Sequence, residues 1–191
     1  MMRINKNNKN SVVLPQKASS DYIPQQANLF EGESLLHLVN SIQREIKVAR
    51  LSDESLTHKI WLKQQFSIGV NDVTRVLERM PPLIGSISSI PQNATYSRRN
   101  SKSPPIQMQA IIIATDCNPR GLTKHLPSLA SSREVPVIFV KDKKGGSFKL
   151  GEMVNLKTAM AIGVKARGNS INKLIGEIVG DNQVNKEVTG S

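Results

Sequence analysis

Three polar side chains of different chemistry lie close together at Asn71, Asp72 and Arg75. The amide donates and accepts hydrogen bonds, the carboxylate accepts them, and the guanidinium donates them in a fixed fork. Such a set can pair with the edges of nucleobases, and arginine suits the O6/N7 edge of guanine. Helical spacing would bring Arg75 beside both Asn71 and Asp72. We therefore predict that this segment reads bases.

A short amphipathic helix is expected to position these side chains. Its apolar residues recur at i, i+3, i+4 and i+7, as Val73, Val76, Leu77 and Met80. This spacing forms one stripe that must face a core and leaves the polar residues at its edge. Asn71 is expected to be the N-cap, Asp72 suits the positive end of the helix dipole, and Pro81 should stop the helix.

We find no comparable pattern for catalysis or for metal binding. His37, His58 and His125 are scattered without the spacing of metal ligands. Cys117 and His125 lack a third group that would complete a nucleophile and its base, and Asp116 is more simply explained as a helix cap. Neither a P-loop nor a GxGxxG pattern occurs. The sequence predicts a non-catalytic protein with no metal and no cofactor.

The composition indicates a polyanionic partner. Lys and Arg number 26 against 15 for Asp and Glu, so the formal net charge of the 191 residues is +11. An excess of this size favours a nucleic acid over a membrane surface. A single cysteine excludes an intrachain disulfide and favours a reducing compartment. The sequence shows neither a spanning apolar run nor an apolar leader, so we expect a cytosolic or nuclear protein.

The chain is expected to hold one domain with extensions. Residues 1–30 form a basic N-terminal tail, 31–180 the domain, 81–107 a long surface insertion, and 181–191 a C-terminal tail. The cluster Arg98, Arg99 and Lys102 within the insertion suits phosphate contact, nuclear import or regulation by serine phosphorylation, or is simply solvated charge.

Helices and strands are expected to alternate along the domain. Strands are predicted at 66–68, 110–114, 135–140 and 158–164, and helices from 34, at 53–66, from 118, at 150–154 and from 169 to 180. This order gives an α/β fold, a three-layer α/β/α sandwich around a mixed sheet of about four strands. Trp61 offers a platform for base stacking, but we expect it in the core because no other aromatic residues cluster near it.

The segment Gly69–Arg79 resembles the signature of the kink-turn-binding ribosomal-protein family, Gly-x-Asn-Glu-Val-Thr-Lys-x-Leu-Glu. That family includes an archaeal ribosomal protein, core proteins of box C/D and H/ACA particles, and a subunit of nuclear ribonuclease P and RNase MRP. Its signature reads tandem sheared G·A pairs of a kinked RNA. The resemblance covers about residues 56–166 and implies the same sandwich. It implies RNA binding by Gly69, Asn71, Asp72 and Arg75, where Asp72 and Arg75 replace Glu and Lys with the same charge.

The resemblance also implies that two further loops meet the signature helix. Lys141 and Lys144 lie on the loop after the strand that ends near 140, and are expected to bind phosphates. Met153, Val154 and Asn155 lie on the next loop, where relatives cover a flipped-out nucleotide. Met153 and Val154 suit that role by their softness and size, and they equally suit packing beneath the edge of the sheet.

The segment Asn155-Leu156-Lys157-Thr158 and the arginine at Arg75 are most similar to the ribonuclease P and MRP subunit. This likeness implies a nuclear and nucleolar protein that binds ribonuclease P or MRP RNA and other protein subunits, and that supports tRNA and ribosomal-RNA processing. Catalysis would then belong to the RNA. Alternatives are a core protein of a snoRNP or of the ribosome, or a protein-interaction module of the same fold.

Overall fold

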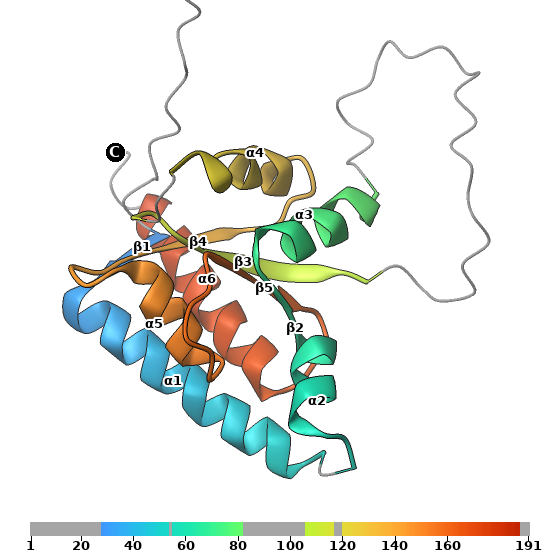
Figure 1. Cartoon of the computed structure of the whole chain (residues 1–191). Coiled ribbons are helices and arrows are strands. Elements are labelled where there is room, and N and C mark those ends of the chain that lie inside the picture. The colour runs from blue at the N-terminus through green and yellow to red at the C-terminus, as the bar shows by residue number, and fades with distance from the viewer. Residues whose placement is uncertain (1–27, 54, 82–105, 117–119, 188–191) are drawn as a thin grey trace, which may run out of the picture.

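The computed structural model of the chain describes residues 28–53, 55–81, 106–116 and 120–187 (Figure 1). The strands are β1 Leu29–Glu31, β2 Phe66–Ile68, β3 Met108–Ala114, β4 Val137–Lys141 and β5 Ala161–Lys165. The helices are α1 Gly32–Leu51, α2 His58–Gln65, α3 Val70–Arg79, α4 His125–Ser131, α5 Gly146–Met153 and α6 Ser170–Glu187, with a 3₁₀ turn at Arg120–Leu122. In the described residues no helix is long and apolar enough to span a bilayer.

The strands form one mixed sheet in the order β1-β4-β3-β5-β2. β4 pairs in parallel with both β1 and β3, whereas β5 is antiparallel to its neighbours β3 and β2. The carboxyl ends of β1, β4, β3 and β2 and the amino end of β5 therefore lie along the same edge of the sheet. The loops that leave this edge are consequently brought together.

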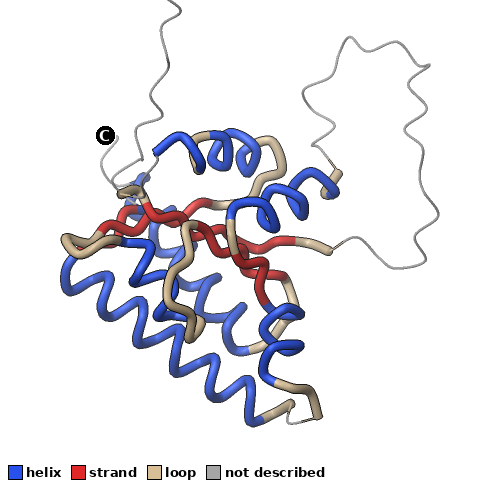
Figure 2. Tube along the Cα trace, viewed as in Figure 1, coloured by secondary structure: helices blue, strands red, loops and turns tan. Residues whose placement is uncertain are grey.

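Helices cover both faces of the sheet, so the fold is the predicted three-layer α/β/α sandwich (Figures 1 and 2). Helices α3 and α4 lie on one face, and α1, α5 and α6 lie on the other. Strand β3 supplies both cores because successive side chains point to opposite faces. Ile111 and Ile113 pack with Val73 and Leu77 of α3, while Ile112 packs in the core of the other face.

The sequence predicted the four strands β2 to β5 but missed β1, which pairs Leu29 with Phe139 at the edge of the sheet. Trp61 is buried, 5% exposed, with its ring edge-on to Phe66 at a centroid distance of 6.5 Å. Its expected core position is therefore confirmed. Its neighbour Ile60 is 48% exposed, because α2 begins at His58 and turns Trp61 and Leu62 to the core.

The last helix begins where it was expected and ends later. Asn169 caps it, since its side-chain oxygen accepts the backbone N–H of Asn172 at 3.3 Å. The helix does not stop at Gly180 but continues to Glu187, so it includes much of the predicted C-terminal tail. Most of the predicted N-terminal tail, nearly all of the 81–107 insertion and the predicted helix start at Asn118-Pro119 lie outside the described residues.

Candidate nucleic-acid interface

The amino end of α3 lies at the edge of the sheet where the loops converge. Gly69 precedes this helix with φ +97°, a backbone conformation that side chains rarely adopt. Its N–H donates to the carbonyl of Ala161 at 2.8 Å, and its own carbonyl accepts from Val73 at 3.1 Å. Gly69 therefore joins β5 to the first turn of α3. Gly69, not Asn71, is the N-cap, so that expectation for Asn71 is wrong.

The three predicted base-reading side chains are exposed on the first turns of α3. Nη1 of Arg75 lies 3.4 Å from Oδ1 of Asp72, and the two side chains are 60% and 58% exposed. An ion pair this open to water contributes little to stability. The guanidinium and the carboxylate can therefore exchange their mutual contact for contacts to a ligand. Val73 and Leu77 on the same helix are fully buried and hold it against the sheet.

An open groove of about 670 Å³ lies beside these side chains. The residues that line it are Ile68, Gly69, Val70, Asn71, Asp72, Arg75, Leu122, Thr158, Ala159 and Met160. A Cβ atom added at Gly69 would meet no atom within 4 Å, so the groove is open beside that glycine. Its wall combines hydrogen-bonding groups on α3 with apolar groups from three other segments. A planar, partly polar ligand such as a nucleobase suits such a wall.

The resemblance implied that the loop before the last strand meets the signature helix, and the second wall of the groove lies at the end of that loop, at residues that were not named as site residues. Thr158, Ala159 and Met160 precede β5, and the antiparallel pairing of β5 with β2 brings them beside Ile68. Leu122, from the segment before α4, is 45% exposed and also lines the groove. Thr158, Ala159 and Met160 were predicted as the first residues of a strand at 158–164, whereas β5 begins at Ala161. Nothing along the chain shows which strand is the neighbour of β5.

The prediction that Met153 and Val154 pack on an extruded base is wrong for their side chains. Each is 1% exposed and belongs to the core between the sheet and α1. The alternative, packing beneath the sheet, is what the structure has. Together with Leu150 these residues follow the i, i+3, i+4 spacing of a helix stripe, which was the signal for their burial.

Asn155 is exposed but does not line the groove. It has φ +56° just after α5, and asparagine tolerates this left-handed conformation better than most residues. The N–H of Leu156 donates to the carbonyl of Gly151 at 2.9 Å, and that of Asn155 to Glu152 at 3.3 Å. This pattern is a Schellman motif, so the structure gives Asn155 the role of ending the helix.

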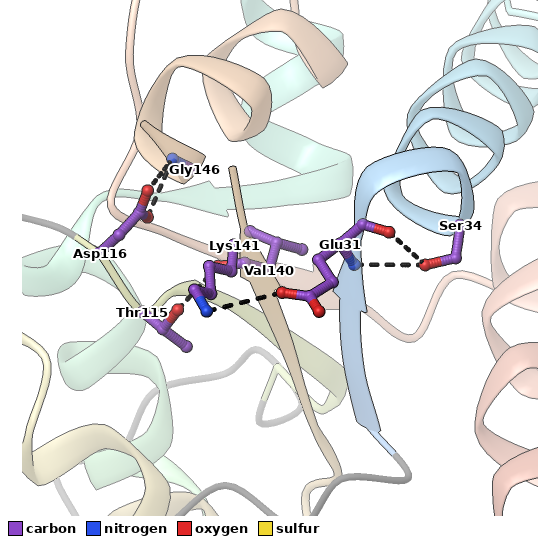
Figure 3. A network of polar contacts seen from close by, with 7 residues as sticks. All are labelled: Glu31, Ser34, Thr115, Asp116, Val140, Lys141 and Gly146. Carbon is purple, nitrogen blue, oxygen red and sulfur yellow. Dashed lines mark hydrogen bonds and ion pairs between the residues drawn. The ribbon is translucent and has the colours of Figure 1, made fainter. Parts of the chain in front are cut away.

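The two predicted phosphate ligands lie on the same edge of the sheet as the groove but outside it. Lys141 ends β4, and its ammonium lies 3.6 Å from Oε2 of Glu31 at the end of β1 (Figure 3). Both side chains are about 60% exposed, so this pair is also weak. Lys144 is exposed on the following loop, where its backbone N–H donates to Asp142 at 2.8 Å. Two strands, β3 and β5, separate β4 from β2 at the groove.

Asp116 holds the start of α5 beside this loop (Figure 3). Both of its carboxylate oxygens accept the backbone N–H of Gly146, at 2.9 and 2.7 Å. Gly146 must be glycine, because an added Cβ would lie 2.5 Å from Oδ1 of Asp116 and 3.0 Å from the carbonyl of Val140. Asp116 was expected to cap the helix predicted from 118, whose start lies outside the described residues. The structure shows its carboxylate at the first residue of α5 instead, where Gly145 is the N-cap.

Two lysines have shifted pKa values. Lys149 donates a hydrogen bond to Glu152 at 2.8 Å, and this bond raises the pKa of Lys149. Burial lowers the pKa of Lys165, and the nearby Arg167 lowers it further, although the ammonium donates to the carbonyl of Lys63. Neither lysine lines the groove. In the part of the chain that the structure describes, no group of three or more His, Cys, Asp or Glu residues is placed to hold a metal ion.

The arrangement defines an α/β/α sandwich with a polar and apolar groove at one edge of a mixed sheet. A solved structure of this kind is the Giardia lamblia 15.5kD RNA binding protein, which matches with a TM-score of 0.51 and 16% sequence identity. The match covers 84% of the present chain and 98% of the Giardia protein. The two chains therefore share their fold.

The second comparison concerns the sequence. Residues 105–174 match the model of the Ribosomal protein L7Ae/L30e/S12e/Gadd45 family. This segment begins before β3 and ends within α6, so it holds the central strands and the 154–160 loop that lines the groove. Helix α3 lies before it, so the match and the resemblance at Gly69–Arg79 arise from different parts of the chain.

Proposed function

We propose that this protein binds RNA, without catalysing a reaction, by taking a kinked or bulged element at the groove beside α3. The observation that carries the proposal is the exposed set Asn71, Asp72 and Arg75 at the rim of a half-apolar groove. These groups offer donors and acceptors to base edges, and base contacts select the sequence. The family match of residues 105–174 and the shared fold with an RNA-binding protein of Giardia support the proposal.

Apolar groups of the groove would receive a base that leaves the stack. Val70 and Met160 line the groove and are only half-buried, and we assign this contact to them in place of Met153 and Val154. Lys141 and Lys144 would bind phosphates outside the groove, supported by the net charge of +11. Phosphate contacts give affinity and salt dependence, whereas contacts in the groove give selectivity.

The proposal is tested by measuring the affinity of the full chain for a kink-turn RNA. Asn71→Ala and Arg75→Ala should each cost about 1–3 kcal/mol of binding free energy, because each removes contacts to a base edge. Both side chains are exposed, so circular dichroism and the unfolding midpoint should stay as in the wild type. Arg79→Ala is the matched control, since it removes the same charge from the exposed far end of α3.

Wild-type affinity in both Asn71→Ala and Arg75→Ala would refute the assignment of these residues to the bases. An equal loss of RNA affinity in Arg79→Ala would show that binding depends only on the positive charge of α3 and not on contacts to a base. An RNA of the same length without the kink should bind the wild type more weakly and with a similar dependence on salt, because only the phosphate contacts remain.

We further propose that the RNA is that of nuclear ribonuclease P or RNase MRP, with the protein acting as a subunit in the nucleus and nucleolus. The features that support this choice are Arg75 and the segment Leu156-Lys157-Thr158, which are similar to the subunit of those particles. The tagged protein should co-purify with ribonuclease P or MRP RNA when bound RNA is sequenced. Recovery of box C/D or ribosomal RNA alone would reject this choice and leave the groove assignment intact.

A further inference from the structure

Phe148 differs from the other aromatic residues that the structure describes. Trp61, Phe66 and Phe139 are at most 5% exposed, and Phe30 is half-buried. Phe148 lies on α5 and is 51% exposed. Its ring rests against the backbone of Gly145, where an added Cβ would lie 2.9 Å from Cδ2 of the ring. The ring therefore lies close to Gly145 and is still half exposed to water.

A short path joins this ring to the groove. The N–H of Ala159, a residue of the groove wall, donates to the carbonyl of Ser147 at 2.9 Å. Phe148 is the next residue after Ser147. The loop that forms the second wall of the groove thus lies directly on the helix that carries the exposed ring.

Exposed lysines flank the same region. Lys143 and Lys144 lie on the loop before α5, and Lys157 lies on the loop after it. Among the described residues none of these three ammonium groups is within ion-pair distance of a carboxylate. The nearest acidic side chain on α5, Glu152, is paired with Lys149 at 2.8 Å. An exposed ring among unpaired cations fits a single-stranded nucleic acid, which offers a flat base and a phosphate in each unit.

We propose that Phe148 stacks on an unpaired nucleobase of the RNA strand that leaves the groove, while Lys143, Lys144 and Lys157 bind the adjoining phosphates. The site accepts any base, because stacking uses the flat face that every base has. This site rests on the proposed function of the groove and extends it by a few nucleotides of single strand.

The test compares a blunt kink-turn RNA with the same RNA carrying a four-nucleotide single-stranded extension on one stem or on the other. The wild type should bind one of the extended RNAs more tightly than the blunt RNA. Phe148→Ala should weaken binding of that RNA by between about 5-fold and about 150-fold, the range for loss of one stacked base, and should leave the blunt RNA unaffected. A 2-aminopurine base in the extension should be quenched by the wild type and not by Phe148→Ala.

Two further variants separate stacking from a general apolar contact. Phe148→Trp should retain the affinity for the extended RNA, and Phe148→Leu should lose it, because leucine has apolar area but no ring. Leu51→Ala, which removes an exposed apolar side chain (71% exposed) at the end of α1, is the control and should bind as the wild type does.

Failure of this site and failure of the groove give different results. If Asn71→Ala weakens both RNAs while Phe148→Ala weakens neither, the stacking site is refuted and the groove stands. Full affinity of Phe148→Leu, or loss of a co-purifying protein with unchanged RNA affinity in Phe148→Ala, would assign the ring to a protein contact and refute the inference. If the wild type binds none of the RNAs, the groove assignment and the inference both fail.

Discussion

Removal of the carboxylate of Asp116 should destabilise the protein measurably, because this residue joins β3 to the start of α5. Both oxygens accept the N–H of Gly146, at 2.9 and 2.7 Å. Gly146 is the first residue of α5 and is buried, so in Asp116→Ala its N–H has neither a helical partner nor free access to water.

The size of the effect follows from this geometry. A hydrogen bond to a charged group contributes about 1.5–3 kcal/mol, and Asp116 is half-buried, so we expect a loss of about 2 kcal/mol in the free energy of unfolding. Asp116→Asn keeps one acceptor without the charge and should lose about half as much. Asp142→Ala is the control, because Asp142 accepts the backbone N–H of the exposed Lys144, which water can satisfy instead.

Urea unfolding followed by tryptophan fluorescence suits this measurement. Trp61 is the single tryptophan of the chain and is buried against Phe66, so its emission reports loss of the core. The order of destabilisation should be Asp116→Ala, then Asp116→Asn, then Asp142→Ala. If Asp116→Ala costs no more than Asp142→Ala, the carboxylate does not hold α5 as we have argued.

Three other perturbations have defined outcomes in the same assay. Gly69→Ala should cost about 1–2 kcal/mol, because φ +97° is unfavourable for alanine although its Cβ meets nothing; an unchanged midpoint would contradict this. Leu77→Ala should cost about 2–5 kcal/mol by leaving a cavity under α3, measured against Leu51→Ala as an exposed control. Burial lowers the pKa of Lys165 from 10.5, so the folded protein binds fewer protons than the unfolded chain. The stability of the wild type relative to Lys165→Met should therefore rise as the pH increases from 7 toward 10.5. A stability difference that does not change with pH would contradict this.

The fold was predictable where side-chain periodicity was strong. The run Ala110–Ala114 and the stripe Leu35, Val39, Ile42, Ile46 and Ala49 are buried as expected. β1 was missed because it has only three residues, Leu29 to Glu31, too few to show an alternation. It forms a strand because the exposed edge of β4 offers it backbone partners, which is a property of the folded sheet.

Part of the candidate site was also predictable from the spacing of side chains along one helix. Asn71, Asp72 and Arg75 lie on one helix, so local spacing was enough to group them and to expose them beside a buried stripe. Met153 and Val154 were assigned to an RNA-binding loop although they continue the apolar stripe of α5. Their side chains are buried in the core, so they have no surface role. Asn155 was predicted to bind RNA because of its position in the chain. Its left-handed backbone conformation at the end of α5 instead accounts for an asparagine at this position.

The sequence alone determined the class of the fold, the exposed polar set on α3 and the positive charge, because these depend on composition and on contacts within one element. Only the tertiary structure decided what lies opposite that set. The residues Thr158 to Met160 line the groove with Gly69 because β5 pairs with β2, and Leu122 reaches the same groove from the segment before α4. Phe148 lies near these residues because Ala159 bonds to Ser147. Contacts between segments so distant in the chain are fixed by strand pairing and burial, which no local pattern records.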